Sequence, residues 1–220
     1  RIYRYNLLTD QFELYLDLAE HIYMGLVLHY LFIDSQEQLW IGLNSGLYCC
    51  LLGETPQLID SDCHVTYITE LPQSMAIGTT CDLRIYSKDR NLLQKLCPDT
   101  YVQSLLPLPN KEILLIGTFN CGVKSISLSS WQEQPVKNGS LPHTPIRSMI
   151  EMTPSTVLLG FDGDGVYTYN LSSGEAEPLF TRTNRMLTAM GVYSLCRDCE
   201  DNIWIGTYTG GAFLMMPEET

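Results

Sequence analysis

Hydrophobic residues recur along this chain in short blocks, without the period of a helix. Each block is an apolar triplet followed by Gly, a small polar turn and another apolar run. The five copies are Leu39-Trp40-Ile41-Gly42, Met75-Ala76-Ile77-Gly78, Leu114-Leu115-Ile116-Gly117, Val157-Leu158-Leu159-Gly160 and Ile203-Trp204-Ile205-Gly206. Their glycines are 36, 39, 43 and 46 residues apart. No stretch keeps a 3.6-residue apolar period over three turns, so the pattern predicts short β-strands.

Each repeat divides into four strands punctuated by Gly, Pro, Asn, Asp and Ser. In the first repeat we predict strands over Val27–Asp34, Leu39–Leu43, Leu47–Leu52 and Gln57–Asp60. In the second they are Val65–Leu71, Met75–Thr79, Leu83–Ser87 and Asn91–Leu96, and in the fourth Ile146–Met152, Thr156–Phe161, Val166–Leu171 and Glu175–Phe180. Four antiparallel strands per repeat of about 40 residues are typical of the blade of a β-propeller. The sequence therefore predicts an all-β propeller fold.

The two ends of the chain predict incomplete blades. Residues 1–19 resemble the last two strands of a blade, and residues 191–220 resemble the first three. Between them we expect four full blades, over about 25–60, 64–97, 101–136 and 145–181. Propellers have four to eight blades, so we interpret the chain as one segment of a larger propeller.

Composition and charge exclude several classes of function. Hydrophobic residues make up 45% of the 220, enough for a buried core. The formal net charge of −12 argues against nucleic acid and anionic membranes as partners, because both require a basic surface. No apolar run reaches the length of about 18 residues that spans a bilayer.

The last repeat, from Asp198 through Ile203-Trp204-Ile205-Gly206-Thr207 to Gly210-Gly211, resembles the two-component regulator propeller repeat. The first repeat, with Asp34 six residues before Trp40, is similar to it as well. The middle three repeats depart from the pattern, with Ala76, Leu115 and Leu158 in place of Trp and Glu70, Pro109 and Met152 in place of Asp.

The resemblance implies the periplasmic sensor region of a hybrid two-component histidine kinase of the Bacteroides type. It implies a non-catalytic segment that binds extracellular oligosaccharide, in a homodimeric inner-membrane receptor whose kinase lies outside these residues. The alternatives are a propeller glycan lyase or hydrolase, for which Glu20, His21, Asp62 and His64 are candidates, and a protein-interaction scaffold.

Strand topology alone predicts where a ligand binds. In a four-stranded antiparallel blade, the turn between the second and third strands and the connection to the next blade emerge on the same face, which we call the ligand face. Sugar recognition uses aromatic rings together with carboxylate, amide and guanidinium groups. The candidates there are Phe119, Asn120, Asp162, Asp164, His143, Arg147, Arg182, Arg185 and Tyr208. The alternative is that these residues form ordinary solvated turns.

A small basic group stands out against the acidic background. Lys137, His143, Arg147, Arg182 and Arg185 lie in or next to the two longest connections of the ligand face. If they cluster, an anionic sugar is favoured, because Arg pairs with carboxylate or sulfate through two hydrogen bonds. Scattered surface charges explain the same residues.

The remaining motifs predict no cofactor, metal or catalytic residue. Cys196-Arg-Asp-Cys199 has neither the helix that follows a redox motif nor the second pair of a zinc site. Asp162-Gly-Asp164-Gly165 opens like a calcium loop, but position 173 is Ser, so we interpret it as a turn. One disulfide among Cys63, Cys81, Cys97 and Cys121 is left open. Trp40 and Trp204 are expected in the core.

Overall fold

The computed structural model describes residues 1–18, 26–139, 141–179 and 190–216. Over these residues the chain forms six antiparallel sheets, in each of which neighbouring strands follow one another in sequence. The predicted all-β fold, with four-stranded antiparallel units, is confirmed.

Four of the sheets have four strands each, and we call them the first to fourth blades. The first holds β3 (Leu28–Ile33), β4 (Gln38–Leu43), β5 (Gly46–Leu51) and β6 (Gln57–Asp60). The second holds β7 (Val65–Glu70), β8 (Ser74–Thr79), β9 (Leu83–Ser87) and β10 (Leu92–Leu96). The third holds β11 (Val102–Leu108), β12 (Ile113–Thr118), β13 (Val123–Ser127) and β14 (Glu133–Gln134), and the fourth holds β15 (Ile146–Thr153), β16 (Thr156–Phe161), β17 (Gly165–Asn170) and β18 (Ala176–Pro178).

Two smaller sheets flank the blades. The N-terminal hairpin pairs β1 (Ile2–Asn6) with β2 (Gln11–Leu16). The fifth sheet contains β19 (Val192–Arg197), β20 (Ile203–Thr207) and β21 (Ala212–Met215). A short 3₁₀ turn over Pro109–Lys111 joins β11 to β12.

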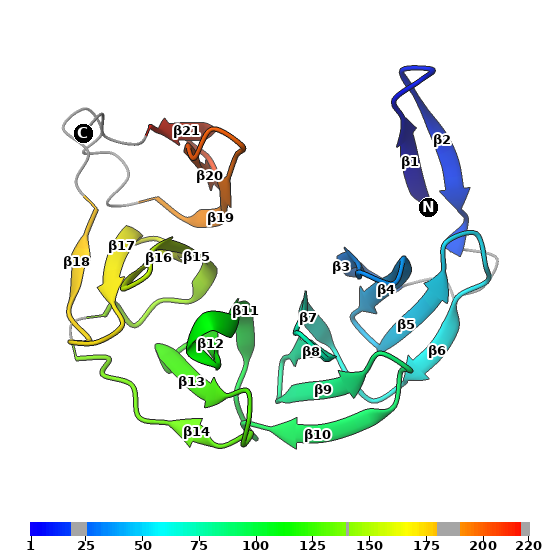
Figure 1. Ribbon diagram of the computed structural model, residues 1–220. Helices are drawn as coiled ribbons and strands as arrows, with labels where there is room; N and C mark the ends of the chain where they lie inside the picture. The colour runs from blue at the N-terminus through cyan, green and yellow to red at the C-terminus, as the bar shows by residue number, and fades with distance from the viewer. Residues whose placement is uncertain (19–25, 140, 180–189, 217–220) are drawn as a thin grey trace.

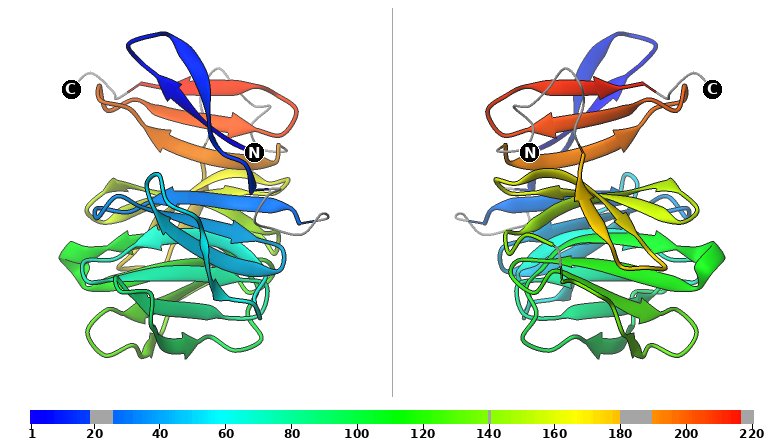
Figure 2. Two further views of the ribbon diagram at one scale, coloured as in Figure 1. Left: turned by 90° about the vertical axis from the view of Figure 1, so that its right-hand side faces the viewer. Right: turned by 90° about the vertical axis from the view of Figure 1, so that its left-hand side faces the viewer.

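The sheets stand side by side in an open arc (Figure 1), with the hairpin at one end and the fifth sheet at the other. The first strand of each blade lies toward the centre of the arc and the fourth strand lies on its outer rim. Turned by 90°, the strands run across the thickness of the arc, so their turns gather on its two faces (Figure 2).

The hydrophobic core lies between neighbouring sheets and not at the centre of the arc. One cluster joins Trp40 and Leu47 of the first blade to Val65, Ile68 and Met75 of the second. Equivalent clusters join the second blade to the third, the third to the fourth and the fourth to the fifth sheet. Middle strands such as β4 and β8 are therefore buried along their whole length, which accounts for their uninterrupted apolar triplets.

The repeat glycines let neighbouring blades approach closely. A Cβ on Gly42 would lie 2.4 Å from Cγ1 of Val65, the first residue of the next blade. Gly78 and Gly160 stand in the same relation to Val102 and Val192, with distances of 2.5 and 2.7 Å. A Cβ on Gly206 would meet only Ser194 of its own sheet. Gly117 faces Ile146 in the same way, at 2.9 Å, so the first four repeat glycines each form a notch that leaves room for a β-branched side chain of the following sheet.

The six-residue interval between Asp and Trp has a hydrogen-bonding cause. The Trp40 indole Nε1 donates to Asp34 Oδ2 at 2.9 Å, while Asp34 Oδ1 accepts from the backbone of the β3–β4 turn. Asp198 and Trp204 repeat this arrangement in the fifth sheet. Trp40 is fully buried as expected, but the core position expected for Trp204 is wrong: its side chain is 44% exposed, because the described residues place no sheet beyond the fifth.

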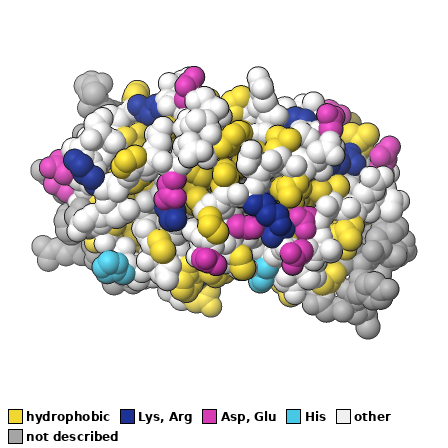
Figure 3. Space-filling model, turned by 90° about the horizontal axis from the view of Figure 1, so that it is seen from below, with side chains coloured by type: hydrophobic (Ala, Val, Ile, Leu, Met, Phe, Trp, Pro, Cys, Tyr) yellow, Lys and Arg dark blue, Asp and Glu magenta, His cyan; other side chains and the backbone are white. Residues whose placement is uncertain are grey.

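Charges of both signs are interspersed on the outer rim of the arc. Seen from below, Lys and Arg side chains lie next to Asp and Glu (Figure 3). Among the ion pairs of the described residues, the best buried is that of Arg84, which bonds Asp60 at 2.6 Å and Asp82 at 3.0 Å. The net charge of −12 is thus not gathered into a single acidic surface on this side.

Candidate ligand-binding face

A β-bulge occurs at the same place in the first strand of every blade and of the fifth sheet. In β3 the pairing shifts between Leu28 and Tyr30, and in β15 between Ile146 and Ser148. The same shift occurs in β7, β11 and β19. A bulge re-aims a side chain and ends regular pairing. The five bulge residues, all near the ligand face on the innermost strands, are His29, Thr66, Gln103, Arg147 and Tyr193.

A second set of residues surrounds these bulges, two positions after each repeat glycine. The backbone N–H of each donates to the residue just before the first strand of its own sheet: Phe119 to Tyr101 at 3.0 Å, and Tyr208 to Gly191 at 2.9 Å. Five equivalent hydrogen bonds fix the positions of Asn44, Thr80, Phe119, Asp162 and Tyr208.

Arg147 is the polar centre of the ligand face over the third and fourth blades and the fifth sheet. Its Nη2 and Nε donate to Asp162 Oδ2 at 2.7 and 3.1 Å, and its Nη1 donates to Gln103 Oε1 at 2.7 Å. The guanidinium carbon also lies 5.0 Å from the ring centre of Tyr193, within range for a cation–π contact. The side chains of Arg147 and Asp162 are about 30% exposed, so the pair is reachable from solvent.

Stacked aromatic pairs flank this ion pair, and in each at least one ring is exposed. Tyr193 and Tyr208 stack with ring centres 5.4 Å apart, and Tyr208 is 75% exposed. Tyr101 and Phe119 stack at 5.0 Å with an interplanar angle of 10°. We call the whole group the crescent; its members are Tyr101, Gln103, Phe119, Arg147, Asp162, Tyr193 and Tyr208. Flat rings beside hydrogen-bonding groups suit a ligand that carries both C–H faces and hydroxyls.

The crescent contains four of the predicted site residues: Phe119, Arg147, Asp162 and Tyr208. Asp164 lies in the same β16–β17 turn as Asp162 and accepts a hydrogen bond from Thr144 at 2.5 Å. Asn120 is exposed and accepts from the Cys121 thiol, and His143 is exposed in the connection before β15. Arg182 and Arg185 lie outside the described residues.

The described members of the predicted basic group do not all point to the same place. Lys137 donates to the carbonyl of Ser173, in the β17–β18 turn on the opposite face, so its ammonium is drawn away from the crescent. The charge of Arg147 is compensated by Asp162.

Three members of the crescent are not among the predicted site residues: Tyr101, Gln103 and Tyr193. Gln103 and Tyr193 are bulge residues, and nothing in the alternation of apolar and polar positions marks a bulge. One signal was available in the sequence: the residue two positions after each repeat glycine lies on the ligand face, and Phe119, Asp162 and Tyr208 share that position.

The first two blades bring two histidines together on the same face. His29, the bulge residue of β3, and His64, the residue before β7, have their Nε2 atoms 3.1 Å apart. Burial and the neighbouring His64 lower the pKa of His29. Of the residues proposed for an enzyme, His64 thus contacts another histidine, while Glu20 and His21 lie outside the described residues.

All eight cysteines lie in the described part of the chain and all are free, so the disulfide left open by the sequence does not form. Cys63 and Cys97 are buried, whereas Cys81 and Cys121 are exposed on the ligand face. Burial raises the pKa of the Cys63 thiol to about 12. Within the described residues no group of three or more His, Cys, Asp or Glu side chains is arranged to hold a metal ion.

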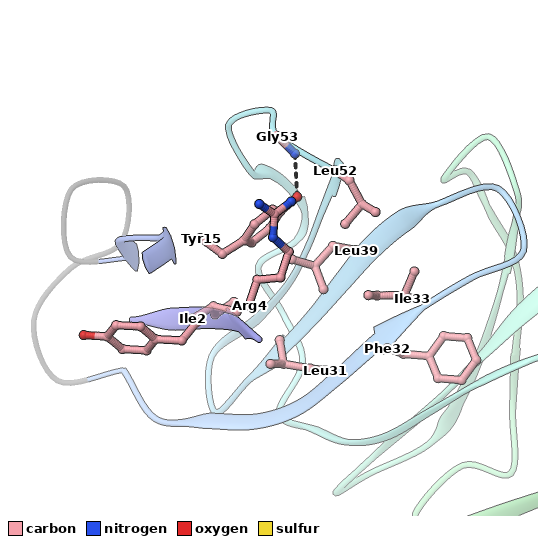
Figure 4. A pocket seen from close by; sticks show the side chains of 10 residues that line it. Ile2, Arg4, Tyr15, Leu31, Phe32, Ile33, Leu39, Leu52 and Gly53 are labelled. Carbon is pink, nitrogen blue, oxygen red and sulfur yellow. Dashed lines mark hydrogen bonds between the residues drawn. The ribbon is translucent and has the colours of Figure 1, made fainter. Parts of the chain in front are cut away.

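A separate apolar cleft of about 640 Å³ lies between the N-terminal hairpin and the first blade (Figure 4). Leu31, Ile33 and Leu39 line one side, and Ile2 and Tyr15 line the other. The Tyr15 hydroxyl accepts from the Gly53 backbone N–H and ties the hairpin to the first blade. The N-terminal hairpin has two strands, whereas each blade has four, and the cleft lies beside β1. Few polar groups line the cleft, so it is poorly suited to orient a sugar.

Comparison with solved structures supports the fold. The chain matches the extracellular domain of BT4673 of B. thetaiotaomicron, described as a hybrid two-component system, at 18% identity and a TM-score of 0.72, over 85% of this chain and 27% of that one. It matches the extracellular domain of BT3049 of the same organism, described likewise, at 17% identity and a TM-score of 0.71, over 87% and 29%. These are proteins of the class that the repeats resemble.

A chain of the Mitotic Checkpoint Complex matches as well, at 11% identity and a TM-score of 0.70, over 99% of this chain and 74% of that one. The chain thus spans between a quarter and a third of the two-component sensors that it matches. No protein-family model and no curated protein matches the sequence. Similarity at these identities establishes the propeller fold, which is shared by proteins of unrelated function. The described residues include no helix that could cross a membrane.

Proposed function

We propose that this chain is the ligand-sensing part of an extracellular receptor of the two-component type, and that it binds oligosaccharide at the crescent without turning it over. The observation that carries the proposal is the placement of two stacked aromatic pairs, with Phe119, Tyr193 and Tyr208 exposed, around the Arg147–Asp162 ion pair. The match to extracellular domains of two-component systems supports the same role. We further propose that the receptor is homodimeric, that this segment lies in the periplasm, and that the signal passes to a kinase outside this segment.

The chemistry of the crescent suits a sugar. Pyranose rings present C–H faces that pack on Tyr208 and Phe119, and their hydroxyls pair with Asp162 and Gln103. Backbone hydrogen bonds fix Phe119, Asp162 and Tyr208, and Arg147 holds Gln103, before a ligand arrives, which reduces the entropy lost on binding. A preference for anionic sugars requires cations beyond Arg147, and Arg182 and Arg185 are the candidates.

The test is calorimetry with a panel of neutral and acidic oligosaccharides. We expect saturable binding, and a loss of about fivefold for Tyr208→Ala or Phe119→Ala, because a stacking contact contributes about 1 kcal/mol. Phe12→Ala is the matched control, since Phe12 is 72% exposed on the N-terminal hairpin.

Equal losses of affinity in all three variants would show that the crescent is not the binding site. Hydrolysis or elimination of a bound glycan would favour the enzyme instead. Acidic members of the panel that bind no better than neutral ones, with no change on Arg182→Ala or Arg185→Ala, would exclude the anionic preference.

A further inference from the structure

Two histidines on neighbouring blades form a group that the crescent does not use. His29 and His64 lie over the first and second blades, whereas the crescent covers the third and fourth blades and the fifth sheet. Their Nε2 atoms are 3.1 Å apart and their ring centres 4.6 Å apart. Both side chains are reachable from solvent, so an ion can approach them.

The backbone on both sides of this contact is fixed. The β3 start is tied to Asn44, which accepts from the Val27 N–H at 3.0 Å and donates its own N–H to the Val27 carbonyl. The carbonyl of His64 accepts from the Thr80 N–H at 3.1 Å. Beside the histidines, Tyr30 and Tyr67 pack with ring centres 4.6 Å apart and join the same two blades. The imidazoles are thus held together by contacts other than their own.

The geometry matches two imidazoles bound to one metal ion. Nitrogen ligands lie about 2.0–2.1 Å from Zn²⁺ and related ions. Two nitrogens 3.1 Å apart then subtend about 98° at the metal, between the octahedral and tetrahedral values. Without metal, one Nε2–H donates to the other Nε2. On binding, the donor imidazole carries its proton on Nδ1, and both Nε2 lone pairs point at the ion.

We propose that His29 and His64 form a two-histidine site for an imidazole-preferring divalent ion of the Cu²⁺, Ni²⁺ and Zn²⁺ class. Because the described residues supply no third His, Cys, Asp or Glu ligand, water or a ligand atom completes the coordination. The ion is therefore exchangeable, in contrast to a structural zinc with four protein ligands. Mg²⁺ and Ca²⁺ are excluded as occupants, since they prefer oxygen ligands. This site is independent of the proposed oligosaccharide binding.

The test is titration of the 220-residue chain with Ni²⁺, followed by calorimetry and by thermal unfolding. Imidazole is a suitable ligand for Ni²⁺. We expect one ion per chain for the wild type and a rise in melting temperature with Ni²⁺. His29→Ala and His64→Ala should each weaken binding at least tenfold and abolish the rise.

The matched control is His143→Ala, because His143 is exposed on the same face but outside the pair. It should bind Ni²⁺ as the wild type does. Melting curves without metal show that each variant is folded, and His29→Gln provides a second variant of closer size. Binding that persists in both His29→Gln and His64→Ala would overturn the proposal, as would equal loss in His143→Ala or equal binding of Mg²⁺.

Discussion

The carboxylate of Asp34 accepts three hydrogen bonds, and it shows how one residue links a turn to the core. Two come from backbone N–H groups of the β3–β4 turn and one from the indole of Trp40, which is fully buried. A buried indole N–H without a partner costs free energy, so Trp in the second strand requires an acceptor at a fixed distance along the chain. That requirement accounts for the spacing by which the first and last repeats resemble each other.

Asp34→Ala should lower the free energy of unfolding by about 3 kcal/mol, because it leaves buried donors unpaired. Urea denaturation measures the change. Asp198→Ala is the matched control: it removes the same three kinds of hydrogen bond, but Trp204 is half-exposed and water replaces the carboxylate. A loss for Asp198→Ala as large as for Asp34→Ala would contradict the role assigned to burial.

His29 makes stability depend on pH in a defined direction. Burial and His64 lower its pKa, so the unfolded chain binds its proton more readily than the folded chain. Stability is therefore complete above the ordinary histidine pKa of about 6.5 and falls as the pH drops through that value toward the folded pKa.

Denaturation at a series of pH values between 7.5 and 5 tests this in metal-free buffer. His29→Gln should flatten the decline, and His143→Gln should leave it as in the wild type. An unchanged slope in His29→Gln would show that other groups cause the decline.

At the scale of the element, strand positions were predictable because apolar runs and turn residues mark them. The strands predicted over Gln57–Asp60 and Thr156–Phe161 are confirmed as β6 and β16. Although β6 is an outer strand, another outer strand was placed less well: the one predicted over Glu175–Phe180 is β18, Ala176–Pro178. An outer strand has a partner on one side only, and its mixed side chains carry little periodic signal.

The bulges could not be predicted. Each adds one residue to a first strand, and the apolar pattern on either side continues as before. Their positions depend on pairing with the second strand and on the approach of the next blade. This is why the sequence predicts Arg147, from its charge, but gives no indication of Gln103 and Tyr193 beside it.

Gly42→Ala should destabilise the chain by about 2 kcal/mol, because its Cβ would meet Val65 Cγ1 and Cβ and push β7 away from β4. Chemical denaturation gives the value. Gly206→Ala is the control, since its Cβ would meet only the Ser194 hydroxyl, which can rotate. If both variants lose the same stability, the notch does not hold the blades together.

At the scale of the whole molecule, the cysteines report whether the arc is assembled. Cys49, Cys50, Cys63 and Cys97 are buried, and Cys81, Cys121, Cys196 and Cys199 are exposed. Burial also raises the pKa of Cys49 and Cys63 to about 12, which suppresses the reactive thiolate.

Alkylation at pH 8 followed by mass spectrometry should modify the four exposed thiols quickly and the four buried ones only after unfolding. Alkylation in denaturant without reductant is the reference and should modify all eight. Fast labelling of Cys63 in native buffer would show that the first and second blades do not pack as described.

The contact between one blade and the next joins unlike surfaces: a glycine notch receives, and a β-branched side chain enters. Such a head-to-tail interface has a direction but sets no limit on the number of blades, so no residue in it specifies how many blades follow. The number is decided by the rotation between successive blades, which either closes a ring or winds into an open helix. A propeller built this way gains or loses a blade by duplication or deletion of one repeat, with every interface reused unchanged.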